Sequence, residues 1–146
     1  MDFHALLRVI HITSFASWFG TIFASFFLLK TLEPGLTGDE KQKADDYSLL
    51  LRRFIKLETK VADVAVISVI LSGLLLAHFY VGWTPWVFAK ICLIVVQIAL
   101  TMGFIVKAIQ PITYPCDVAT YTAWYKLFTI SFSMFGIILL VTFFLR

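Results

Sequence analysis

Charged residues are scarce in this chain of 146 residues, since Asp, Glu, Lys and Arg together make up 14% of it. A typical water-soluble domain is about a quarter charged. The hydrophobic fraction is 60%, and there are only two cysteines and three methionines. This composition excludes an ordinary water-soluble domain and predicts a protein of the lipid bilayer.

Several patterns that would identify a chemistry are also missing. No phosphate-binding loop, Ser-His-Asp arrangement or paired-carboxylate site is apparent in the sequence, so hydrolytic and nucleotide-dependent reactions are not expected. Cys92 and Cys116 fall at different membrane depths, so we expect no disulfide between them. The net charge of +3 reflects basic residues in the predicted cytoplasmic loops, and it gives no support for nucleic-acid binding.

Four long apolar stretches account for most of the chain. A helix needs about 20 apolar residues to cross the hydrocarbon layer of a membrane. Lipid offers no partners to free backbone groups, so helices are the expected spanning structure. We therefore predict an all-α fold, a single four-helix transmembrane bundle over residues 1–146. The predicted spans are residues 5–29, 61–81, 86–106 and 124–145.

The basic residues predict the topology. Nine of the twelve lie in the connections 30–60 and 107–123 or in their flanks. Positively charged loops remain in the cytoplasm. We therefore expect these two loops to be cytoplasmic, both termini to lie outside, and the protein to reside in the cytoplasmic (inner) membrane.

The first connection has its own helical signals. Thr37 to Glu40 is typical of a capping box at the start of a helix. No glycine or proline occurs between Gly38 and Gly73, which favours one continuous helix extending from the cytoplasm into span two. The alternative is an in-plane amphipathic helix over residues 39–54. Before the fourth span, Asp117 is expected to act as an N-cap.

The first span has two distinct faces. One carries small residues at intervals of four, which predict close helix packing: Ala16, Gly20 and Ala24. The other aligns His4, His11 and Trp18 at intervals of seven. Polar stripes are also predicted on span three, at Lys90, Gln97 and Thr101, and on span four, at Thr129, Ser133 and Gly136.

Depth brings the polar groups of the outer side together. His11 lies about 10 Å below the start of span one, at ~1.5 Å per residue. His78 lies near the outer end of span two, and Lys90 about one turn into span three. We predict one outer polar layer, with these members: His4, Arg8, His11, His78 and Lys90.

The chemistry of these side chains suits a redox cofactor. Neutral imidazole is a good ligand for haem iron, copper or zinc. Arg8 is suited to pair with a haem propionate. Deep ionisable residues in membranes are usually functional, which makes His11 the strongest candidate. The other readings are interfacial positions for His4 and His78, and snorkelling for Lys90.

Short segments resemble a family of small four-helix membrane proteins. Residues 7–20 (LRVIHITSFASWFG) carry a His, Trp and Gly at His11, Trp18 and Gly20. The segment Leu71-Ser72-Gly73-Leu74 and the Trp86 to Lys90 start of span three are further similarities. These features resemble the HemJ-type protoporphyrinogen oxidases and the CopD-type copper-resistance membrane domain.

The resemblance implies b-type haem held by His11 and Lys90. The Arg and Asn-Glu-x-Pro pattern of the HemJ fourth span has no counterpart in residues 124–146, so haem binding is expected here rather than protoporphyrinogen oxidation. A Cu(I) site is less expected, because soft Met or Cys ligands are lacking near the outer histidines.

The leading hypothesis is a b-type cytochrome that exchanges electrons with a quinol (or quinone) or a partner subunit. His11 would be one axial ligand and His78 or Lys90 the other, with haem b as cofactor. If the protein is an enzyme, it would be a haem-dependent membrane oxidoreductase. The alternatives are copper or other metal handling through His11 and His78, and a cofactor-free accessory subunit within a homo- or hetero-oligomer.

Overall fold

All regular structure is helical in the residues that the computed structural model describes, 2–100 and 113–144. The elements are α1 (Phe3–Leu36), α2 (Lys41–Leu76), a π-helical turn η1 (Ala77–Val81), α3 (Pro85–Leu100) and α5 (Val118–Phe144). This confirms the predicted all-α class. Helix α1, helix α2 with η1, and helix α5 are long and apolar enough to cross a membrane. The end of the predicted third span, up to residue 106, lies outside the described residues.

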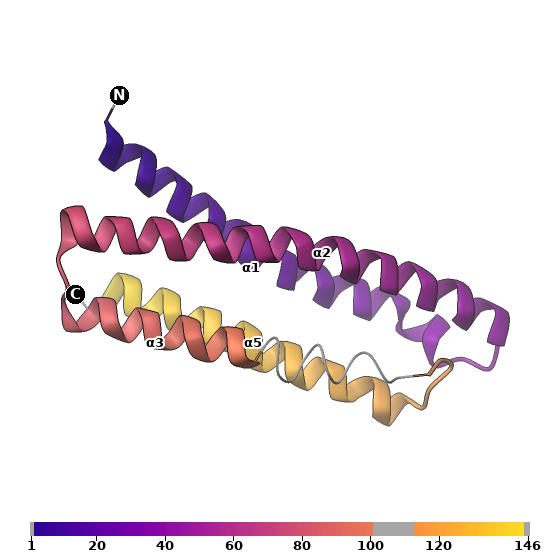
Figure 1. Ribbon diagram of the computed structural model, residues 1–146. Helices are drawn as coiled ribbons and strands as arrows, with labels where there is room; N and C mark the ends of the chain where they lie inside the picture. Colours follow the sequence, from indigo (N-terminus) through magenta and orange to yellow (C-terminus); the bar gives the residue numbers. More distant parts are fainter. Residues whose placement is uncertain (1, 101–112, 145–146) are drawn as a thin grey trace.

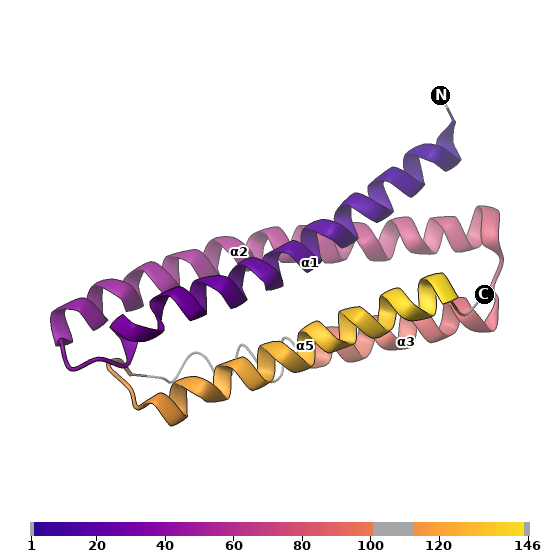
Figure 2. The ribbon, with the colours of Figure 1, turned by 180° about the vertical axis from the view of Figure 1, so that it is seen from behind.

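Helices α2, α3 and α5 run lengthwise beside one another, while α1 is inclined to α2 and its N-terminal part diverges from the other helices (Figure 1). Helices α1 and α2 form one antiparallel pair, and α3 and α5 form a second pair beside it. The view from behind shows the same arrangement (Figure 2). The start of α1, η1, the start of α3 and the end of α5 share one end, here called the histidine end. The α1–α2 connection and the start of α5 lie at the other, here called the basic end.

Helix α2 is continuous from Lys41 to Leu76, as the sequence favoured. The predicted capping box is wrong, however. Thr37 ends α1 instead, because its hydroxyl and its backbone N–H both donate to the carbonyl of Glu33, at 2.8 and 3.0 Å. Glu40 is the residue before α2, and its side chain makes no capping hydrogen bond. Helix α1 runs seven residues past the predicted span, which leaves Thr37 at its C-terminal end.

The packing face of α1 is the one that carries Trp18. Trp18 is buried and meets Phe135 of α5 edge-on, with ring centroids 4.7 Å apart. The small residues at intervals of four, Ala16, Gly20 and Ala24, are exposed, so their predicted packing role is wrong. Helices in lipid associate through van der Waals contact. The large side chains of the opposite face provide more of that contact than the small ones.

Close contacts fix the basic end. A Cβ atom on Gly35 would lie 2.1 Å from Cδ2 of Tyr47, so the tyrosine ring of α2 rests directly on the glycine of α1. The Tyr121 hydroxyl of α5 donates to the carbonyl of Leu29 at 2.6 Å. These two contacts set the level of α2 and α5 relative to α1.

Gly35→Ala should destabilise the protein by about 1–3 kcal/mol, because the new methyl group must displace the Tyr47 ring. The matched control is Gly20→Ala, where a Cβ would meet nothing within 4 Å. Helical glycine costs roughly 0.5–1 kcal/mol relative to alanine, so the control should be neutral or stabilising. Thermal unfolding in detergent compares them; equal melting temperatures for the two variants would contradict the contact.

Asp117 caps α5, as predicted. Its carboxylate accepts hydrogen bonds from the Thr120 hydroxyl and, at 3.1 Å, from the Thr120 backbone N–H. These bonds hold the pKa of Asp117 below its ordinary value of 3.8. The cap therefore stabilises the fold above that value and ceases to do so as the pH falls through the lower, folded-state pKa.

Asp117→Ala should lower the melting temperature at neutral pH, and the difference from the unmodified protein should shrink in strong acid. Circular dichroism melts across the acid range measure this. A difference that stays constant with pH would show that the carboxylate charge contributes nothing to the cap.

Candidate functional site

A cavity of about 470 Å³ lies between α1, α2 with η1, α3 and α5, towards the histidine end. Its walls are mostly aliphatic and aromatic. Three polar or charged side chains reach it, from three different helices: His11, Lys90 and Thr142. An apolar cavity with few polar groups is the usual form of a small-molecule or cofactor site.

His11 is tied to the backbone of α2. Its Nδ1 atom lies 3.1 Å from the carbonyl oxygen of Val69 and 3.0 Å from Oγ of Ser72. A carbonyl oxygen only accepts, so Nδ1 carries the hydrogen. The Ser72 hydroxyl donates to the carbonyl of Ser68 at 2.5 Å, which leaves its oxygen free to accept from Nδ1. The imidazole therefore keeps the lone pair on Nε2 for a ligand.

Gly73 lets the imidazole lie against α2. A Cβ atom at this position would be 3.0 Å from Cε1 and 3.4 Å from Nδ1 of His11. A larger residue would require the imidazole ring to shift by a few tenths of an ångström. Ser72 and Gly73 lie in the Leu71 to Leu74 segment that resembles the family's second span, but no sequence pattern pairs them with His11. A signal was present: they are the small residues of α2 at the depth of the histidine.

Lys90 shares the cavity with His11. It lies near the start of α3 and lines the same walls. The structure thus brings together two of the predicted outer residues, one from α1 and one from α3. Thr142 of α5, which the sequence did not single out, is a third polar residue of these walls and donates to its own helix at the carbonyl of Ile138.

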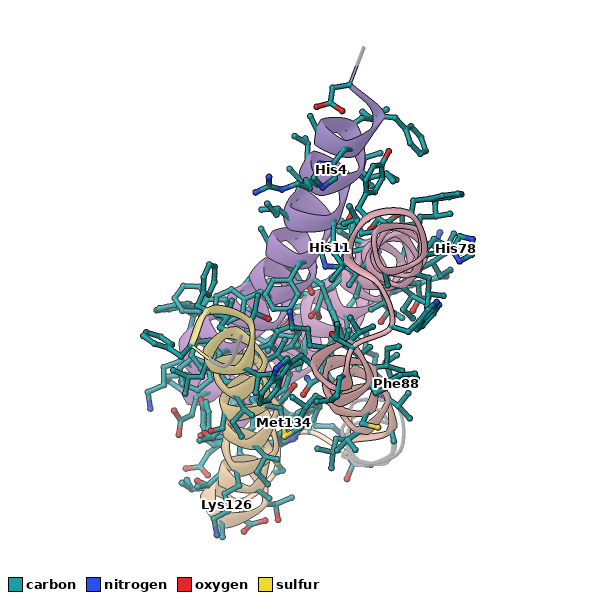
Figure 3. All side chains as sticks on the ribbon, turned by 90° about the vertical axis from the view of Figure 1, so that its left-hand side faces the viewer. His4, His11, His78, Phe88, Lys126 and Met134 are labelled. Carbon is teal, nitrogen blue, oxygen red and sulfur yellow. The ribbon has the colours of Figure 1, made fainter. Side chains whose placement is uncertain are left out.

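The other predicted residues lie away from this cavity (Figure 3). His78 is exposed and lies on the opposite side of α2 from His11, with its ring edge-on to Phe79 at 4.8 Å. His4 stacks on Tyr80 at 4.3 Å, and Arg8 is exposed. Among the described residues, no three His, Cys, Asp or Glu side chains are grouped as a metal site. The predicted outer layer is thus divided between the cavity and the surface.

Trp18 and Gln97 serve packing. Trp18 is in the core between α1 and α5 and does not line the cavity. Gln97 is fully buried, and its amide nitrogen donates to the Ser131 hydroxyl at 2.6 Å, which joins α3 to α5. The predicted stripe residues Thr129 and Ser133 are exposed and bond their own helix.

Comparisons found no matching family model, no similar curated protein and no similar solved structure. The resemblance to the HemJ and CopD families therefore stays a prediction. The site rests on the geometry of His11, Lys90 and the cavity.

The neutral His11 side chain should carry its hydrogen on Nδ1. Histidine-selective ¹⁵N NMR of the protein in lipid nanodiscs measures this without any cofactor. Gly73→Ala should shift the His11 signals, because the methyl group crowds Cε1. Gly136→Ala is the matched control, since a Cβ there meets nothing within 4 Å. A hydrogen on Nε2, or equal spectra for both variants, would contradict the arrangement.

Proposed function

We propose that the protein is a membrane haem-binding redox protein of the b-type cytochrome kind, with His11 as an axial ligand. The single observation that carries the proposal is the pair of contacts to His11 Nδ1 from the Val69 carbonyl and Ser72. A histidine that ligates a metal almost always donates its other ring N–H to a carbonyl, carboxylate or water. That bond fixes the tautomer and the ring orientation in advance of metal binding.

The cavity residues fit haem in two respects. Its apolar walls suit a largely apolar macrocycle, and its volume lies within the range of about 300–1,000 Å³ that is usual for ligand sites. Lys90 is the better candidate for the second residue that would hold the haem iron, because it lines the same cavity as His11. His78 is disfavoured, since it is exposed on the far side of α2.

The bound haem would supply one-electron chemistry. The chain itself would bind and orient it: Val69 and Ser72 hold the His11 imidazole, and the apolar walls exclude water. Arg8, one turn before His11 at about 4.5 Å along the axis, is the candidate to meet a propionate at the surface. A quinol or a partner subunit is the proposed electron partner, in the cytoplasmic membrane with both termini outside.

Spectra of three variants test the assignment. The protein, expressed with excess haem precursor and purified in detergent, should show a Soret band and sharp reduced α and β bands. His11→Ala should reduce bound haem at least about tenfold. Mutating a residue that only hydrogen-bonds a metal ligand already lowers metal affinity by about that factor. His78→Ala, the matched control, should keep the spectrum of the unmodified protein.

Lys90→Leu should retain haem but remove one iron ligand, visible as an altered spin state in the absorption and electron paramagnetic resonance spectra. Unchanged spectra in His11→Ala would exclude His11 as the ligand. A colourless preparation that contains copper would support metal handling instead. A colourless, metal-free preparation that copurifies with larger subunits would support an accessory role.

A further inference from the structure

The exposed side of α2 changes character along its length. At about 100° per residue, one sector about 120° wide carries all of the following exposed residues. They are Leu49, Leu50, Arg53, Lys56, Leu57, Lys60, Val64, Ile67 and Leu71. From Val64 onward the exposed side chains of the sector are apolar. Between Leu49 and Lys60, the sector carries three cations and three leucines.

The contacts between α1 and α2 place this mixed part at the basic end of the membrane-spanning region. His11 lies against Ser72 and Gly35 against Tyr47, so Arg53 is level with Lys30, the first charged residue after the apolar part of α1. From Arg53 to Lys60 the helix rises about 10 Å. The headgroup layer on each side of a bilayer is about 5–8 Å thick. Long cationic side chains reach it from slightly greater depth by snorkelling.

The three cations of this sector make no ion pair with any described residue. Within residues 2–100 and 113–144, the ion pair present is that of Lys30 with Glu33, at 2.8 Å on α1. Leu57 is 65% exposed and sits among the cations, while Val64, 67% exposed, continues the same side into the apolar region. A partner that supplied only negative charge would leave the exposed Leu57 side chain in water. A phospholipid has both an acidic headgroup and acyl chains, so it complements both kinds of side chain.

We propose that Arg53, Lys56 and Lys60 bind the phosphates of anionic phospholipids in the leaflet at the basic end. Leu57, Val64 and Ile67, on the membrane side of Arg53, rest against the acyl chains of the same lipids. The site lies at the other end of α2 from the cavity, and it is independent of whether haem is bound. It would anchor the extended α2 at a fixed depth and tilt in the bilayer.

Native mass spectrometry of the full chain, titrated with phosphatidylglycerol or phosphatidylcholine, tests the proposal. The unmodified protein should bind phosphatidylglycerol about tenfold or more tightly than phosphatidylcholine. The variant R53Q/K56Q/K60Q should lose this preference. The matched control K41Q/K43Q/R52Q removes three charges from the same helix outside the sector and should keep it.

Three results would overturn the proposal. They are an unchanged preference in R53Q/K56Q/K60Q, an equal loss in the control, and competition by soluble glycerol 3-phosphate, which would indicate a site for free phosphate. Circular dichroism of each variant verifies that the helices are retained. If R53Q/K56Q/K60Q does not fold, the single variants K56Q and K60Q replace it, and each should show a partial loss.

Discussion

The contact of His11 with α2 is the interaction on which the histidine end depends. An apolar membrane interior offers no water to an imidazole N–H, so that group needs a partner within the protein. The Val69 carbonyl and the Ser72 hydroxyl are that partner, and Gly73 makes room for the ring. One consequence is a fixed register between α1 and α2. The second is that only Nε2 remains for an external ligand.

The same register is set again at the basic end by Gly35 and Tyr47, and α5 is attached to α1 there through Tyr121 and Leu29. The helices are therefore fixed at both ends, while the cavity lies near one of them. Helices α1 and α2, with 34 and 36 residues, exceed the roughly 20 residues that a membrane crossing requires. The histidine end carries the residues suited to a cofactor, and the extended basic end carries the charges.

Local sequence rules predicted two features of the helices correctly, although the predicted capping box over Thr37 to Glu40 was wrong. The absence of glycine and proline between Gly38 and Gly73 predicted a continuous α2, and Asp117 was correctly identified as a cap. The face of α1 that packs was not predictable from spacing alone. Small residues such as Gly20 are compatible both with helix contact and with lipid. Which face of α1 packs depends on the large side chains that the neighbouring helices supply.

The sequence predicted the level of the candidate residues along the helix axes, but not the side of the helix on which each one lies. A rise of 1.5 Å per residue correctly placed His11 and Lys90 near one level. The level of His78 does not fix the side of the helix on which it lies. Ser72 faces His11, and His78 follows six residues later, which is a rotation of about 240° at 100° per residue. His78 therefore points away from His11. The role of Ser72 was hidden for another reason. A serine in a span usually bonds its own backbone, as Ser72 does, and only the fold shows that its oxygen also meets α1.

Anomalous diffraction at the iron absorption edge, from crystals of the haem-loaded protein grown in a lipid phase, is the most direct test of the proposed role of His11. The account predicts one iron peak inside the cavity, within bonding distance of His11 Nε2 and on the side of Lys90. An iron peak beside His78 or His4 at the surface, or a His11 ring turned away from Val69 and Ser72, would contradict it.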